Sequence, residues 1–220
     1  MRRKAGDLIA EMLRQVEETK SQRKIVGSGE YGVVYESNTP GNVIKEARDL
    51  DEDLTKEADF QSIAADMGIA PRVSSVTTSP FYSDSLEMQD IRTNFEKSPS
   101  TLQWPTGNNA VRVNQQLGQL ALKGIRLEDR HAGNVLYNKM TGRPMQIDFG
   151  IADRMSPDQQ AAYLADVTAE GFKAAGIGEL GDILRATVVD YLEGGQVKEA
   201  MDIAKQGFSR LQKIKTPLAS

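Results

Sequence analysis

The spacing of hydrophobic residues changes several times along the chain. Residues 5–23 place apolar side chains at helical intervals between charges, which predicts an amphipathic leading helix. Residues 24–36 and 43–45 are β-branched runs separated by glycines and a turn signal, which predicts three short strands. Helical spacing returns in 51–67 and stops at Gly68, a residue that commonly ends a helix.

Two more predicted strands, 73–76 and 85–91, complete the N-terminal part of the chain. A stretch rich in Ser, Thr, Pro, Gly and Asn follows, as is typical of an exposed connection. Beyond it, helical spacing dominates, interrupted by a strand-and-loop region that ends near residue 151. The pattern predicts an α+β protein in three parts: a leading helix with a small antiparallel sheet (1–91), a connecting segment (92–109) and a mostly helical part (110–220).

Composition narrows the classes of function. Nucleic-acid-binding proteins usually have an excess of basic residues, whereas this protein has a net charge of −4. No nucleic-acid partner is therefore expected. With no cysteine and one histidine, any metal would be held by oxygen ligands. No segment has the roughly 20 apolar residues of a membrane span, and the N-terminus lacks the apolar run of a signal peptide. We therefore expect a cytoplasmic protein without a membrane contact.

A glycine-rich run lies between the first two predicted strands. Gly27-Ser28-Gly29-Glu30-Tyr31-Gly32-Val33-Val34 follows the pattern G-x-G-x-x-G-x-V, in which glycines let backbone N–H groups approach phosphate oxygens. The run alone would also suit a hairpin turn. A dinucleotide site would need a helix after the glycines, and a strand is predicted here.

Charged residues suited to phosphate binding follow in the next two elements. Lys45 ends a predicted strand, and its ammonium group is a point charge that suits nucleotide phosphates. A glutamate one helix later could hold this lysine by an ion pair. Glu57 could fill that position, with Glu52 and Asp59 as competing choices.

Oxygen-bearing side chains cluster in the strand-and-loop region. Asp129 and Asn134 lie five residues apart in one predicted loop, and Asp148 begins an Asp-Phe-Gly sequence after a turn. Phosphoryl transfer needs a carboxylate that positions the acceptor and oxygen ligands for Mg²⁺. These three residues have the chemistry for both tasks.

Together, the motifs in residues 24–153 resemble those of the protein-kinase-like superfamily. They follow one another in the same order as in that superfamily, with compact spacing. The resemblance implies a bilobal fold with ATP and Mg²⁺ bound between the lobes. Lys45 would contact the α- and β-phosphates and pair with Glu57. Asp129 would accept or orient the acceptor proton, while Asn134 and Asp148 would hold the Mg²⁺ ion.

The resemblance also implies a nucleotide pocket. Backbone groups from Gln89 to Ile91 would hold adenine, with Met88 behind it. The phosphates would lie beneath the glycine-rich loop, against the residues Gly27, Ser28, Gly29, Tyr31, Gly32 and Val34.

The chain departs from typical protein kinases at several positions. The usual His-Arg-Asp triplet reads Leu127-Glu128-Asp129, and no Ala-Pro-Glu motif follows Asp148, so activation-loop phosphorylation is not expected. His131 stands where protein kinases have lysine, in a D-x-H-x-G-N pattern similar to aminoglycoside and choline phosphotransferases. The compact helical end is similar to RIO-type atypical kinases. His131 would either contact a phosphate or acceptor oxygen or hydrogen-bond its own loop.

These observations predict an ATP- and Mg²⁺-dependent phosphotransferase acting on a hydroxyl. A protein Ser/Thr acceptor is preferred to a small hydroxylated molecule. The alternatives are a small-molecule kinase and a nucleotide-binding pseudokinase, which usually lacks at least one of the groups present here.

Overall fold

The computed structural model describes residues 11, 14, 23–29, 32–49, 53–79, 83–97 and 105–216. The predicted leading helix lies outside these residues except at Glu11 and Arg14, which are helical and form an ion pair of 2.9 Å. Tyr31 and Glu52 also lie outside them. The chain forms two compact units, one of Met1–Thr55 with Val73–Asp90 and one of Lys56–Arg72 with Ile91–Ser220.

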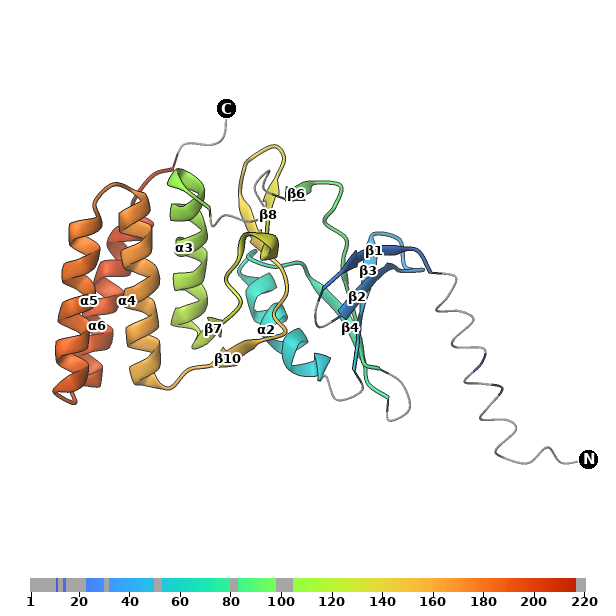
Figure 1. Cartoon of the computed structure of the whole chain (residues 1–220), viewed down its shortest axis with the longest axis horizontal. Helices are drawn as coiled ribbons and strands as arrows, with labels where there is room; N and C mark the ends of the chain where they lie inside the picture. The colour runs from blue at the N-terminus through green and yellow to red at the C-terminus, as the bar shows by residue number, and fades with distance from the viewer. Residues whose placement is uncertain are drawn as a thin grey trace, which may run out of the picture. The chain divides into compact units, whose positions relative to one another are not determined.

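The first unit is built on an antiparallel sheet of five strands, and together with the helices of the second unit this confirms the α+β class (Figure 1). The strand order is β1-β2-β3-β5-β4. Lys45 pairs with Val34 on one side and with Leu86 on the other, which makes β3 a central strand. The strands are β1 (Ile25–Ser28), β2 (Gly32–Glu36), β3 (Asn42–Ala47), β4 (Val73–Thr77) and β5 (Ser85–Gln89).

Helix α2 (Leu54–Asp66) packs mainly with the second unit, although it lies between two strands of the first in sequence. Phe60, Ala64 and Ile69 belong to the hydrophobic core of the second unit, and the Gln146 backbone N–H donates to the Ile69 carbonyl at 2.7 Å. The compact units therefore divide the chain differently from the predicted parts, because residues 56–72 group with the helices.

Four helices form the main body of the second unit (Figure 1). They surround a core that includes Leu164, Phe172, Phe208 and Leu211, each at most 1% exposed. The helices are α3 (Gly107–Leu122), α4 (Pro157–Ala174), α5 (Gly178–Glu193) and α6 (Val197–Gln212). Within the described part of the chain, none of the helices combines the length and hydrophobicity needed to cross a bilayer.

Two small antiparallel sheets carry the loops of this unit. One has the order β6-β8-β9, with β6 (Phe95–Lys97), β8 (Val135–Asn138) and β9 (Pro144–Gln146). The other pairs β7 (Ile125–Leu127) with β10 (Ala152–Arg154). Strand β6 lies within the stretch predicted as an irregular connection, because a three-residue strand with one apolar side chain gives no alternating pattern.

Candidate functional site

The glycine-rich loop is shaped by its contact with Lys45. A Cβ atom on Gly32 would lie 2.8 Å from the Glu46 carbonyl oxygen and 3.0 Å from Lys45 Cε. The lysine side chain therefore runs directly against the third glycine of the motif. At the tip, the Gly29 N–H donates to the Gly32 carbonyl at 2.9 Å and closes the turn. The structure thus brings the glycine-rich loop and Lys45 together in the first unit.

The predicted phosphate-binding lysine and its candidate partners differ in burial. Lys45 is 6% exposed and Glu57 is 2% exposed, and ionised groups this deeply buried are rare unless another charge compensates them. Asp59, a competing choice for the lysine's partner, is exposed. The ion pair between Lys45 and Glu57 stays a prediction.

Arg48 braces the glycine-rich loop and was missed by the sequence reasoning. Its Nε atom donates to the Gly29 carbonyl at 2.8 Å, and its Nη2 atom donates to Ser28 Oγ at 2.6 Å. Only the strand register places this arginine beside the loop, so no local sequence signal could have identified it.

The predicted adenine contacts fall on and after β5. Met88 is half-buried and pairs with Val43 and Val73, whereas Gln89 is exposed. Ile91 is buried. Their roles in nucleotide binding stay predictions.

In the second unit, the loops that carry Asp129 and Asp148 are held between the same two strand pairs. Leu127 pairs with Ala152 at one end, and Val135 pairs with Gln146 at the other. The Ile147 N–H then donates to the Asn134 carbonyl at 2.8 Å. The backbone next to Asp148 is thereby fixed against Asn134, which joins two motifs separated in sequence.

One carboxylate oxygen of Asp129 has two close polar neighbours, of which Asn134 donates a hydrogen bond. The Asp129 Oδ2 atom lies 3.0 Å from Asn134 Nδ2 and 3.1 Å from His131 Nε2. The His131 ring is held in turn, because its Nδ1 atom accepts from the Gly133 N–H at 2.9 Å. A Cβ atom at Gly133 would lie 2.6 Å from His131 Cε1, so a glycine is required under the ring. This histidine therefore hydrogen-bonds its own loop.

Asp148 has an unusual backbone conformation. Its φ of 67° lies in the left-handed region, the only such angle among the described non-glycine residues. Asp tolerates this region better than most residues, because its short polar side chain can hydrogen-bond locally. Here Asp148 Oδ1 accepts from the Gly150 N–H at 3.3 Å. Phe149 lies in the core at 1% exposure and anchors the turn that presents the aspartate.

The side chains of Asn134 and Asp148 carry oxygen atoms of the kind that Mg²⁺ prefers, and their binding of the ion stays a prediction. An ionised carboxylate only accepts hydrogen bonds, so the amide nitrogen of Asn134 must face Asp129 and its amide oxygen is left for a cation. Among the described residues, no group of three His, Asp or Glu side chains could hold a metal ion. Mg²⁺ in phosphoryl-transfer sites binds through one or two protein ligands plus water and substrate phosphates, so this absence does not test the predicted site.

Arg130 ties the same loop to the helices and was also missed by the sequence reasoning. Its guanidinium lies 5.3 Å from the centre of the Tyr163 ring, and Nη2 lies 3.7 Å from Asp166 Oδ2. Arg185 contacts the other oxygen of Asp166 at 2.7 Å and also Glu170 at 2.7 Å. Neighbours from α4 and α5 thus hold the residue that follows Asp129.

The segment after Asp-Phe-Gly is as short as the sequence indicates. Strand β10 occupies residues 152–154, and the Ser156 N–H donates to Gln159 Oε1 at 3.0 Å at the start of α4. Ser156 and Gln159 form a capping box at this helix start.

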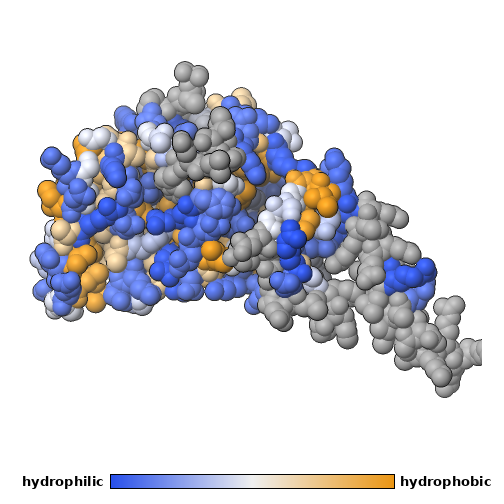
Figure 2. All heavy atoms as spheres, viewed as in Figure 1, coloured by the Kyte–Doolittle hydropathy of each residue, from blue (hydrophilic) through white to orange (hydrophobic). Residues whose placement is uncertain are grey.

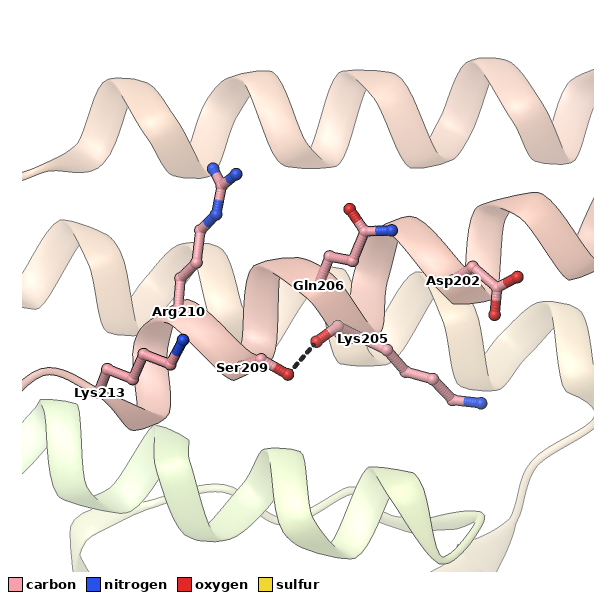
Figure 3. A pocket seen from close by; sticks show the side chains of 6 residues that line it. All are labelled: Asp202, Lys205, Gln206, Ser209, Arg210 and Lys213. Carbon is pink, nitrogen blue, oxygen red and sulfur yellow. Dashed lines mark hydrogen bonds between the residues drawn. The ribbon is translucent and has the colours of Figure 1, made fainter.

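Two grooves on the helical unit contain none of the predicted site residues. One of about 500 Å³ lies along α6 and is lined by Asp202, Lys205, Gln206, Ser209, Arg210 and Lys213 (Figure 3). All six side chains are exposed, as expected of a solvated helix face. A second groove of about 410 Å³ lies between α4 and α5. Hydrophilic side chains predominate on the face of these helices seen in Figure 2.

Comparison with known proteins gives a distant structural likeness. No protein-family model matches the chain, and no curated protein matches its sequence. Among solved structures, the chain is similar to the Cydia pomonella granulovirus kinase PK-1, with 14% identity and a TM-score of 0.48. The similarity covers 75% of this chain and 74% of that chain. A likeness this distant leaves the family and the activity to be argued from the residues themselves.

Proposed function

We propose that this protein is a phosphotransferase that moves the γ-phosphoryl group of ATP to a hydroxyl. The observation that carries the proposal is the loop in which Asp129 and Asn134 share a hydrogen bond of 3.0 Å while the backbone beside Asp148 bonds to Asn134. This contact supports the proposal because it links two motifs that lie 14 residues apart, from Asn134 to Asp148, and that would supply the acceptor-positioning carboxylate and the oxygens for Mg²⁺.

In the proposed reaction, the acceptor oxygen forms a bond to the γ-phosphorus. The bond from that phosphorus to the β–γ bridging oxygen breaks, and ADP leaves with this oxygen. Asp129 takes the proton that the acceptor hydroxyl loses. Lys45 would bind the phosphates of ATP. Bound Mg²⁺, held by Asn134 and Asp148, would neutralise phosphate charge.

We propose a serine or threonine side chain of a folded protein as the acceptor. The short segment between Gly150 and Ser156 supports this choice over a short peptide, because it provides few residues to hold an extended chain. A small hydroxylated molecule is the alternative acceptor.

Two substitutions test the proposal because they affect different steps. Asp129→Asn should leave the affinity for ATP with Mg²⁺ nearly unchanged and lower the transfer rate by about 10²- to 10⁴-fold. Asp148→Asn should weaken Mg²⁺-dependent nucleotide binding and transfer together. Binding is measured by calorimetry, and transfer with labelled ATP, using the enzyme itself and a protein extract as acceptors.

The outcomes separate catalysis from binding. If the wild-type protein binds ATP but transfers no phosphate to any acceptor, including itself, it is a pseudokinase. If Asp129→Asn transfers phosphate at the wild-type rate while chemistry limits that rate, Asp129 is not the acid–base group.

A further inference from the structure

The single histidine of the chain lies against the carboxylate of Asp129. His131 Nε2 is 3.1 Å from Asp129 Oδ2, while its Nδ1 atom is 2.9 Å from the Gly133 backbone nitrogen. Both ring nitrogens are therefore engaged within one loop of the second unit. The ring is also 55% exposed at its side chain, so burial does not account for its placement.

The partners of the ring determine its tautomer. A backbone N–H only donates, so the nitrogen that faces Gly133 must carry no proton. In a neutral imidazole the other nitrogen is then protonated, and Nε2–H is the group that faces Asp129 Oδ2 at 3.1 Å.

The neighbours of Asp129 leave its two oxygens unequal. Oδ2 receives a hydrogen bond from Asn134 at 3.0 Å and lies 3.1 Å from His131 Nε2. Within the described residues, Oδ1 receives no hydrogen bond. Two side chains of the same loop therefore face Oδ2 and leave the other oxygen for another proton.

We propose that His131, as the neutral Nε2–H tautomer, is a positioning residue that holds the Asp129 carboxylate with Oδ1 turned to the acceptor hydroxyl. This rests on the proposed function, in which Asp129 takes the hydroxyl proton. The proposal assigns the histidine to the orientation of the base and not to a phosphate of ATP. Loss of such orientation should slow the chemical step and leave nucleotide binding unchanged.

A double-mutant cycle distinguishes the two roles. His131→Phe keeps the size of the ring and removes both polar contacts, and it should lower kcat about tenfold to a hundredfold with an unchanged KM for ATP. In an Asp129→Asn background the same change should have no further effect on kcat, because His131 acts only through Asp129. His131→Gln, which retains an N–H donor of similar reach, should recover part of the rate.

A contact with phosphate would give a different pattern. His131→Phe would then raise the KM for ATP and lower the rate equally in both backgrounds, and this result would overturn the proposal. So would a wild-type rate in His131→Phe. Unfolding curves of each variant identify a loss of rate that comes from a loss of fold.

Nuclear magnetic resonance tests the hydrogen bond without any activity. Because the chain has one histidine, a long-range ¹H–¹⁵N spectrum of the wild-type protein assigns its ring directly. For the neutral ring, a single Nε2–H tautomer is expected. An Nδ1–H ring or a mixture of tautomers contradicts the positioning role. If instead the wild-type protein transfers no phosphate, the proposed function fails while this spectrum still tests the loop geometry.

Discussion

At the scale of single residues, two glycines of the same loop have different surroundings. Gly32 lies so close to the Lys45 side chain and the Glu46 carbonyl that a methyl group cannot fit without a shift of β3. Gly29 has no atom within 4 Å of the position its Cβ would take. The lack of a side chain at Gly32 therefore permits the close approach of Lys45, whereas a side chain at Gly29 would meet no neighbouring atom within 4 Å of its Cβ.

This difference predicts opposite results for two alanine substitutions. Gly32→Ala should displace Lys45, destabilise the protein by about 1–3 kcal/mol through overpacking and reduce the rise in melting temperature that ATP with Mg²⁺ produces. Gly29→Ala, the matched control, should retain most of that rise. Thermal unfolding with and without nucleotide measures both effects. An equal loss of the nucleotide-dependent rise in the two variants would show that Gly32 has no special relation to Lys45, the lysine proposed to bind phosphate.

At the scale of elements, close contacts at glycines allow the helices of the second unit to pack. A Cβ atom at Gly118 in α3 would lie 2.0 Å from Cε2 of Phe208 in α6, and Phe208 is 1% exposed. A fully buried ring has no free space to move into. This glycine sets the separation of α3 and α6, although glycine disfavours a helix interior by about 1 kcal/mol relative to alanine.

Gly118→Ala should therefore destabilise the protein despite its better helix propensity. We expect a net loss of about 1–2 kcal/mol, because overpacking in a full core costs up to about 3 kcal/mol. Gly178→Ala at the start of α5 is the control, since its Cβ would meet other atoms at 3.8 Å or more, an ordinary contact distance. Denaturant unfolding measures both variants. A stabilised Gly118→Ala protein would show that α3 and α6 can separate at little cost.

At the scale of the whole molecule, one buried phenol links stability to alkaline pH. Tyr137 is 8% exposed, and its hydroxyl has no hydrogen-bond partner among the described residues. Burial raises the pKa of Tyr137 to about 12, from an ordinary value of 10.0. The neutral phenol is thus favoured in the folded state. The stability that this preference provides is fully present below pH 10 and is lost as the pH rises toward 12.

Tyr137→Phe should remove this part of the alkaline loss. Below pH 10 the variant should be as stable as wild type or more so, because it lacks the unpartnered hydroxyl. Between pH 10 and 12 its free energy of unfolding should fall less steeply, by about 2–3 kcal/mol over the range. Burial also raises the pKa of Tyr163, so some loss remains in the variant. Superimposable pH profiles for the two proteins would contradict the assignment.

The sequence by itself determined the α+β class, most of the elements and the types of residue in the candidate site. Strands β1 to β5 and helices α2 to α4 lie where periodicity and turn residues predict them, because these signals are local. The spacing from Asp129 to Asn134 is also local, since five residues of one loop place both side chains within reach of each other. The identity of the acceptor has no such local signal.

Only the tertiary structure decided which distant groups meet. The pairing of β8 with β9 brings the backbone beside Asp148 to Asn134, and the register of β2 on β3 places Lys45 under Gly32. Arg48 and Arg130 reach their partners across strands and helices, so their spacing along the chain carries no signal. The fold of the 129–134 loop directs one nitrogen of His131 to Gly133 and the other to Asp129. The hydrogen bond from the Gly133 N–H to His131 Nδ1 depends on the position of both partners in space, so composition and periodicity could not show it.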